Sequence, residues 1–290
     1  MPRDRLALIS DVHGNLTALE AVLADIADRG ITRILNLGDY VGKGPRGNAV
    51  VARCREVCEV NILGNWDDHI GDRSFDKGDS VWWRAELDDD QVDWLAALPF
   101  CHEIVMSGRR IRMMHASSTS VHRRVRYIKT EEEFLGQFRN TDATRAVLGD
   151  GPEPDVVVYA DTHDPAFETQ HRSRTLINIG AVGNAMGDPT ACYVILEGEL
   201  DRPDPAPFAT TFVRVPYDVE AELAVARAAG VPELAGYEAE LRLGLYRGLV
   251  AAHERGEYGL DDYYHPYPPM NLPQFLRRRE DAPPAQEPRA

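Results

Sequence analysis

Acidic, histidine and amide side chains recur in this chain just after short apolar runs. Asp11 and His13 follow the run LALIS, and Asp39 follows RILNLG. Three later runs, VNILG, IRMM and VVVYA, are followed by Asn65, Asp67, His115, Asp161 and His163. Carboxylates, imidazoles and amides are ligands for divalent ions such as Mn, Fe and Zn. Any one such residue could be a hydrogen-bonded polar group of the core, but the repeated pattern predicts a metal site.

All of these side chains except Asp67 are candidate ligands, and they exceed the needs of a single tetrahedral ion. They fit two metals that share a carboxylate. Two metals roughly 4 Å apart clamp an in-line displacement at phosphorus and lower the pKa of the water between them. Because no cysteine is among the candidates, the set argues against a structural zinc site.

Alternating elements must position these residues. Strand-like runs over 5–10, 31–40 and 58–65 are separated by helix-like runs over 15–30 and 47–57, with Asn15 as the N-cap of the first helix. This alternation is typical of a layered α/β fold. In such folds ligands bind at the carboxyl ends of strands, which is where the candidate ligands fall.

In the second half of the chain, the predicted strands and helices no longer alternate regularly. Two short helices are predicted over 80–87 and 88–99, lying over the strand ends, and further helices over 218–230 and 233–256. Tight turns predict an antiparallel or mixed sheet from strands at 101–108, 110–117, 155–161, 174–181, 191–198 and 209–217. Residues 277–290 have the composition of a disordered tail.

Composition limits the possible partners. The 290 residues carry 47 acidic and 32 basic side chains, for a net charge of −15. Such a surface repels long nucleic acids and anionic membranes, whereas a small phosphorylated substrate can still bind near metal ions. No apolar stretch is long enough for a membrane span or a signal peptide, so we expect a cytoplasmic protein. The four cysteines, including Cys54 and Cys58, are expected to be buried apolar residues.

The motifs SDVHGN, LGDYVGKGP, LGNWDD, MMHAS and ADTH resemble, in this order, the signatures of the calcineurin-like metallophosphoesterases. The resemblance covers about residues 5–245, and the GNW motif is similar to that of a bacterial, diadenosine tetraphosphatase-like subgroup. It implies an αββα sandwich of two mixed sheets flanked by helices. It also implies a catalytic domain over 1–216 with insertions at 66–100 and 116–154, a helical extension over 217–260, and an aromatic, proline-rich tail over 261–290.

The resemblance further implies two divalent transition metals, Mn first, with Fe, Zn or Co as alternatives. The implied ligands are Asp11, His13 and His163 for one metal, Asp39 as the bridge, and Asn65, His115 and Asp161 for the other. Asp39, Asn65 and His115 are the implied catalytic residues. A hydroxide between the metals would attack phosphorus.

Trp66 stands where many family members have a histidine that protonates the leaving group. Tryptophan cannot perform acid–base chemistry, so the sequence favours substrates with good leaving groups, such as phosphodiesters or phosphoanhydrides. Trp66 could stack a nucleobase or simply pack in the core. His69 and His122 are candidate substitute acids, or else idle surface histidines.

Asp161 stands where the family usually has a histidine ligand. The extra negative charge favours Mn over Zn, unless the shorter side chain leaves the second site weak or empty. The following candidates for substrate binding could equally be solvated surface charges: Arg46, His122, Arg123, Arg124, Arg126 and Lys129. Asp67 is expected to orient a histidine ligand rather than bind metal.

Three functions remain open from the sequence. The first is hydrolysis of small phosphodiesters or nucleotide polyphosphates, and the second is a phosphomonoesterase. The third is a degenerate interaction scaffold, in which the aromatic stretch 258–275 would contact a partner. The sequence leaves the oligomeric state undetermined.

Overall fold

The computed structural model describes residues 3–75, 78, 80–125, 129–170 and 174–247. Arg126 and the tail over 261–290, with its aromatic stretch, lie outside these residues, as does the end of the helix predicted over 233–256. None of the helices in the described part combines the length and the apolar character that a membrane span needs.

The first sheet carries the N-terminal strands at its centre. Strand β1 pairs in parallel with β2, with Leu8 opposite Leu35, and β2 pairs in parallel with the short β3. Strand β9 runs antiparallel to both β1 and β10. The spatial order is β10-β9-β1-β2-β3, and the bounds are β1 Asp4–Ile9, β2 Arg33–Asn36, β3 Val60–Asn61, β9 Ala191–Gly198 and β10 Ala209–Val215.

The second sheet is also mixed. Strands β5, β6 and β8 are parallel neighbours, and the edge strands β4 and β7 run antiparallel to them. The order is β4-β5-β6-β8-β7, and the bounds are β4 Cys101–Met106, β5 Arg109–Met114, β6 Val156–Tyr159, β7 Ala166–Gln170 and β8 Arg174–Asn178. The predicted mixed pairing of this half is confirmed.

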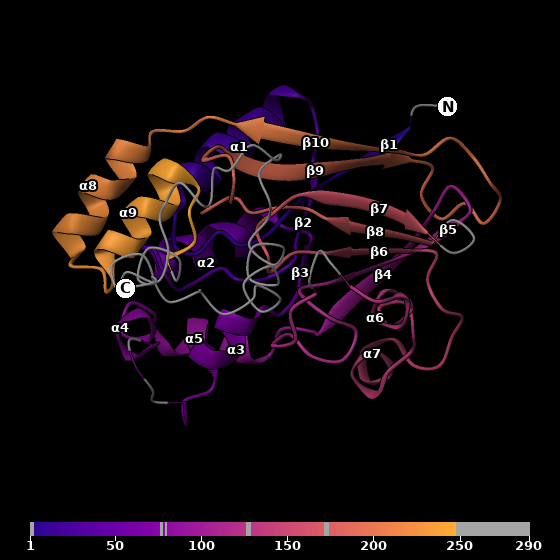
Figure 1. Ribbon diagram of the computed structural model, residues 1–290, viewed down its shortest axis with the longest axis horizontal. Coiled ribbons are helices and arrows are strands. Elements are labelled where there is room, and N and C mark those ends of the chain that lie inside the picture. Colours follow the sequence, from indigo (N-terminus) through magenta and orange to yellow (C-terminus); the bar gives the residue numbers. More distant parts are fainter. Residues whose placement is uncertain (1–2, 76–77, 79, 126–128, 171–173, 248–290) are drawn as a thin grey trace, which may run out of the picture.

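The two sheets pack face to face and helices cover their outer faces (Figure 1). Leu8 of β1 and Val158 of β6 lie in the apolar layer between the sheets. Helices α1 (Leu16–Asp28) and α2 (Gly47–Val57) pack on the first sheet, and α6 (Glu131–Gly136) packs on the second. Burial of each large apolar side chain in these layers contributes about 1.5–3 kcal/mol to stability. Because the two sheets pack together and helices cover them, the predicted αββα sandwich is confirmed.

The remaining helices are α3 (Asn65–Gly71), α4 (Ser80–Arg84), α5 (Asp89–Ala96), α7 (Asp142–Leu148), α8 (Val219–Ala229) and α9 (Leu234–Leu243). Helices α4, α5 and α8 were expected. Helix α9 is shorter than predicted, because Gly244 ends it in the left-handed conformation. The apolar side chains of α8 and α9 join the core that contains α1; the division of the chain into domains remains a prediction.

Three local features differ from the sequence expectation. The strand expected over 58–65 shortens to β3 because the chain turns at Gly64 into α3, a seven-residue helix that the sequence did not predict. Strand β7 was also missed, since it is an exposed edge strand with Phe167 facing solvent. All four cysteines are free and buried, as expected.

Asn15 and Gly183 tie the loop after β8 to the end of β1. The Asn15 side chain caps α1 by accepting from Ala18 and also donates to the Gly183 carbonyl at 2.7 Å. The Gly183 amide donates to the Asp11 carbonyl at 2.8 Å. A Cβ atom on Gly183 would stand only 1.9 Å from the Val12 carbonyl oxygen, so only glycine fits here.

Gly183→Ala should therefore lower the free energy of unfolding by about 1–3 kcal/mol, because the backbone must move to relieve the clash. Urea denaturation at neutral pH measures this loss. Gly151→Ala is the matched control, because a Cβ atom there meets nothing within 4 Å. Equal stability of the two variants would contradict the close approach.

Candidate metal centre

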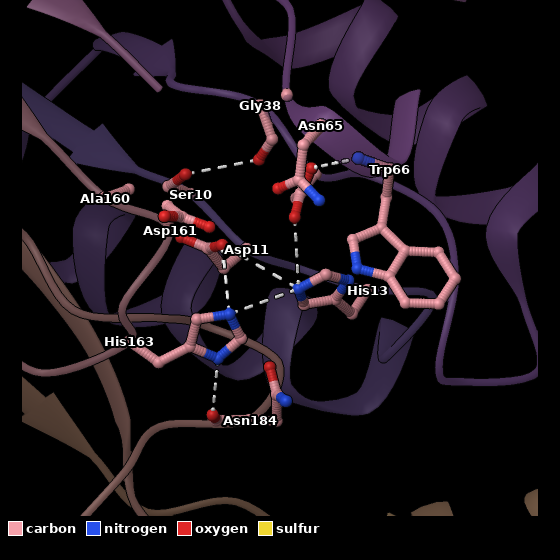
Figure 2. A network of polar contacts seen from close by, with 12 residues as sticks. Ser10, Asp11, His13, Gly38, Asn65, Trp66, Ala160, Asp161, His163 and Asn184 are labelled. Carbon is pink, nitrogen blue, oxygen red and sulfur yellow. Dashed lines mark hydrogen bonds and ion pairs between the residues drawn. The ribbon is translucent and has the colours of Figure 1, made fainter. Parts of the chain in front are cut away.

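The predicted ligands converge where strands of both sheets end (Figure 2). Asp11 and His13 follow β1, and Asp39 follows β2, all in the first sheet. His115 follows β5 and His163 follows β6, both in the second sheet. All five side chains are buried. The seam between the sheets thus gathers ligands from Asp11 to His163, which lie 152 residues apart in the chain.

The backbone at these residues is strained. Asp11, His13, Asp39, Asp161 and His163 all have φ between 49° and 63°, the left-handed region that residues other than glycine rarely adopt. Each such residue costs of the order of 1–3 kcal/mol and persists only where the surrounding structure enforces it. Asp11 and His13, like Asp161 and His163, are two residues apart, so a continuing strand would keep them on one face but about 6–7 Å apart along its axis. The left-handed turns let the ligand atoms come closer together than that.

Backbone carbonyls fix the three imidazole rings. The Nδ1 atoms of His13, His115 and His163 lie 3.1, 2.8 and 2.9 Å from the carbonyl oxygens of Val41, Leu37 and Asn184. A carbonyl can only accept, so each Nδ1 carries a proton, and a ring that is neutral presents its Nε2 lone pair. This arrangement is the usual support of metal-binding histidines.

The Nε2 atoms point at one another and at the carboxylates. The Nε2 atom of His13 lies 3.3 Å from that of His163 and 3.4 Å from Asp39 Oδ2. His163 Nε2 is 3.2 Å from Asp11 Oδ1, and His115 Nε2 is 3.5 Å from Asp39 Oδ2. The ligand atoms form two groups, each within 4.8 Å: Asp11, His13 and His163, and Asp11, Asp39 and His115.

The donor set fits a divalent cation. Asp11 is fully buried, and neither of its carboxylate oxygens has a hydrogen-bond donor among the residues that the structure describes. A buried carboxylate without such partners is strongly destabilised unless positive charge lies close to it. Burial alone would lower the pKa of His115, but the charge and hydrogen bond of Asp39 raise it to about 10. The pocket therefore favours a positive charge among these oxygen and nitrogen atoms.

Asn65 and Asp161 stand apart from the two groups in different ways. Asn65 Oδ1 lies 3.1 Å from His115 Nε2, so its amide faces the cluster. Both Asp161 oxygens instead accept from the guanidinium of Arg124, each at 3.0 Å. The metal-ligand role of Asp161 remains a prediction.

Asp67 does not orient a histidine, so that expectation is wrong. Its two oxygens accept the backbone amides of Asp39 at 2.7 Å, Gly64 at 2.9 Å and Tyr40 at 3.0 Å. Asp67 thus joins the loop after β2 to the start of α3. The physical reason is that the backbone carbonyls already occupy the Nδ1 atoms of the histidines.

Trp66 packs beside the candidate ligands. Its ring contacts His13 edge-to-face with 5.9 Å between ring centroids and Trp83 with 5.2 Å, and Trp82 contacts Trp83 at 5.9 Å. A Cβ atom on Gly42 would lie 2.2 Å from the Trp66 ring, so the ring fills space that glycine leaves open. This contact accords with the packing interpretation.

Of the basic candidates for substrate binding, some are exposed at the surface and others form ion pairs with acidic residues of the chain. Arg46 was a candidate for substrate binding or for a solvated surface charge, and its guanidinium bonds Thr17 and the buried Glu222 of α8. Lys129 was considered a solvated or substrate-facing charge, yet its side chain is buried against Glu168. Arg123 is exposed.

His122 and His69 lie together outside the two ligand groups. His122 Nε2 is 2.6 Å from Asp68 Oδ2, and the two imidazole rings are 4.5 Å apart. Burial lowers the pKa of His69, and the charge of His122 adds to this effect. Their role as substitute acids remains a prediction.

Sequence reasoning missed Lys43. Its side chain is 5% exposed, its φ is 61°, and it lines a small cavity with His163 and Arg124. Burial lowers the pKa of its ammonium group, against the opposing charges of Glu240, Asp11 and Asp39. A lysine inside the glycine-rich stretch GKGP was the signal that could have identified it.

Sequence reasoning also missed the support that α9 gives to His163. The Asn184 carbonyl holds His163, and the Asn184 amide donates to the buried Glu240 at 3.2 Å. Glu240 accepts from the backbone amide and guanidinium of Arg247 at 2.9–3.1 Å. Burial alone would raise the pKa of Glu240, but the charges of Lys43 and Arg247 lower it to about 2. An ionised Glu240 thus anchors a metal-ligand loop to the C-terminal helices.

Comparison with known proteins defines the class. A family model described as the calcineurin-like phosphoesterase superfamily domain matches residues 5–201, so this chain belongs to that superfamily and is a hydrolytic metallophosphoesterase. The chain resembles the crystal structure of a metallophosphoesterase from Sphaerobacter thermophilus, with a TM-score of 0.63 and 28% identity over 83% of this chain and 99% of that one.

Two sequence relatives extend this comparison. An uncharacterised protein of Methanocaldococcus jannaschii is 26% identical over 76% of this chain and 90% of its own length. A symmetrical bis(5'-nucleosyl)-tetraphosphatase of Paracidovorax citrulli is 31% identical, over 38% of this chain and 43% of its own length.

Mn²⁺ should stabilise the wild type much more than it stabilises Asp11→Asn. Mn²⁺ at one hundred times its dissociation constant stabilises the wild type by about 2.7 kcal/mol. Asp11→Asn removes a buried charge, so the chelated variant should be at least as stable as the chelated wild type, and Mn²⁺ should stabilise it much less. Thermal unfolding with EDTA and with Mn²⁺ measures both effects, with the surface variant Asp90→Asn as the control. A chelated variant less stable than chelated wild type would contradict this account.

Glu240→Gln should weaken metal binding from a distance. Arg247 would lose a buried partner, which costs about 3–5 kcal/mol of stability, and the looser His163 should reduce Mn²⁺ affinity about tenfold. Isothermal titration at a temperature where the variant is folded measures the affinity. Glu238→Gln, which breaks surface ion pairs of the same helix, should leave the affinity unchanged. Equal affinity in both variants would show that α9 does not support the centre.

Proposed function

We propose that this protein is a dinuclear, Mn²⁺-dependent phosphoesterase that hydrolyses small phosphodiesters or nucleotide polyphosphates in the cytoplasm. The observation that carries the proposal is the pair of ligand groups joined by shared carboxylates. Asp11 belongs to both groups, and Asp39 Oδ2 lies within 3.5 Å of the Nε2 atoms of both His13 and His115. A pair of adjacent ions is the arrangement used for in-line displacement at phosphorus.

Asp11, His13 and His163 would hold one ion, and Asp39, His115 and Asn65 would contribute to the other. Divalent ions bound there would polarise the phosphoryl group and make water a nucleophile at neutral pH. The residues of the chain keep the ligands in place: carbonyls fix the rings, and Asp67 holds the Asp39 loop. The indole of Trp66 lies edge-to-face against His13, and it offers the leaving group no titratable proton.

The lack of an acid at Trp66 supports substrates with good leaving groups. A leaving group of low pKa departs as an anion without a proton donor, whereas a serine or alkyl alkoxide requires one. Phosphoanhydrides and aryl or nucleoside diesters therefore suit the site better than phosphoproteins. The partial similarity to a bis(5'-nucleosyl)-tetraphosphatase supports the nucleotide polyphosphate class.

Two other functions have some support. A phosphomonoesterase would use the same ligands and would differ in relative rates on monoesters and diesters. The pairing of both Asp161 oxygens with Arg124 is the observation that favours a scaffold with an incomplete second metal group. Metal content and activity distinguish these functions.

Asp39→Asn should abolish Mn²⁺-dependent hydrolysis of bis-p-nitrophenyl phosphate. Losing several kcal/mol of metal-derived stabilisation corresponds to about a thousandfold lower kcat/KM. The diester and the p-nitrophenyl monoester are assayed side by side, with Asp90→Asn as the surface control.

A faster diester rate in the wild type supports a phosphodiesterase, and a faster monoester rate supports the phosphomonoesterase. If the wild type hydrolyses neither ester with Mn, Fe, Co or Zn, the proposed function is wrong and the scaffold gains support.

A further inference from the structure

Asp161 and Arg124 form an ion pair with a buried inner partner and an accessible outer one. The Asp161 side chain is 5% exposed and that of Arg124 is 43% exposed. Both carboxylate oxygens accept from the guanidinium, from Nε and from one terminal nitrogen. The arginine therefore occupies the coordination positions of this carboxylate while remaining reachable from solvent.

Asp161 lies beside the second ligand group. The amide of Ala160, the residue before it, donates to the His115 carbonyl at 2.9 Å. The charge of Asp161 also contributes to the raised pKa of His115, after burial and the effects of Asp39 and Asp11. Asp161 thus follows directly on a residue bonded to His115, and Arg124 engages its carboxylate.

A cavity opens next to this ion pair. Its lining includes Arg124, Asp161, His163, Tyr246 and Lys43. Lys43 is 5% exposed, and its ammonium group forms no hydrogen bond or ion pair with any residue that the structure describes. Two cationic groups, the Lys43 ammonium and the Arg124 guanidinium, line this cavity, so it attracts an anion such as phosphate.

We propose that Arg124 exchanges partners during the catalytic cycle. A substrate phosphate entering this cavity takes the guanidinium away from Asp161, and the freed carboxylate completes the second metal group with Asp39 and His115. The inference rests on the proposed function, because it assigns the second metal to that site. Arg124 then has two successive roles, first blocking the second metal and then binding the substrate.

The exchange follows from the chemistry of the guanidinium. Its planar fork matches the oxygens of a carboxylate and of a phosphate equally well, so phosphate can replace Asp161 without loss of hydrogen bonds. Arginine keeps its charge at every working pH, so a guanidinium and a divalent cation on the same carboxylate repel each other. Phosphate and the second metal must therefore strengthen each other's binding, because such coupling is reciprocal.

The test measures Mn²⁺ binding to the full chain with and without inorganic phosphate, by isothermal titration and by the electron paramagnetic resonance signal of coupled Mn²⁺ pairs. Without phosphate, the wild type should bind one ion tightly and a second at least about tenfold more weakly. Saturating phosphate should tighten the second ion about tenfold or more and increase the coupled-pair signal.

Arg124→Met distinguishes this exchange from a simpler cause, in which phosphate bridges the two metals directly. Removing the competitor should let the second Mn²⁺ bind tightly without phosphate, and phosphate should then have little further effect. Asp161→Asn should bind one ion tightly under both conditions. Arg145→Met, which removes an exposed arginine of α7, should behave as wild type. Because the expected effect of Arg124→Met is a gain of affinity, misfolding cannot mimic it.

Three outcomes would overturn the proposal. Phosphate coupling that persists in Arg124→Met would show that phosphate bridges the metals directly. Two equally tight ions in the wild type without phosphate would remove the blocking role, while leaving the dinuclear phosphoesterase intact. A single ion in the wild type and in Arg124→Met alike would refute both this exchange and the dinuclear function.

Discussion

The burial of negative charge at the seam between the two sheets is the constraint on which the rest of the structure depends. Asp11 and Asp39 are buried, and within the described part of the chain no hydrogen-bond donor reaches the Asp11 carboxylate. Such carboxylates are unfavourable on their own and favourable around a cation. The left-handed turns that carry them add further cost. The surrounding sandwich must therefore be stable enough to offset these costs, because the ligand side chains would move apart in a less rigid fold.

Each element around the seam contributes to this rigidity in a particular way. Backbone carbonyls aim the imidazole rings, and Asp67 gathers three amides at the turn that carries Asp39. Asn15 links α1 to the loop after β8. From the far end of the described chain, Glu240 reaches the same loop through Asn184. The metal centre is thus supported by backbone groups and by residues distant in sequence, and little depends on solvent-exposed charges.

The sequence was informative about the features that depend on residues close together in the chain. Asp11, His13 and Asp39 each follow an apolar run, so their convergence could be predicted, as could the mixed sheets. It was uninformative where partners are far apart. Arg46 meets Glu222 across 176 residues, and Arg124 meets Asp161 across 37. Such pairs leave no periodic pattern, because an arginine in a loop looks the same whether it faces solvent, substrate or a buried carboxylate.

The tryptophan contacts beside the centre have a photophysical consequence. Trp82 meets Trp83, Trp83 meets Trp66, and Trp66 meets the edge of His13. Excitation absorbed by any of these indoles can pass between neighbours and reach the ring next to a metal ligand. A paramagnetic ion at His13 would quench emission there, whereas a diamagnetic ion would not. The ultraviolet fluorescence of the protein can thus distinguish a paramagnetic ion at this position from a diamagnetic one, without any added label.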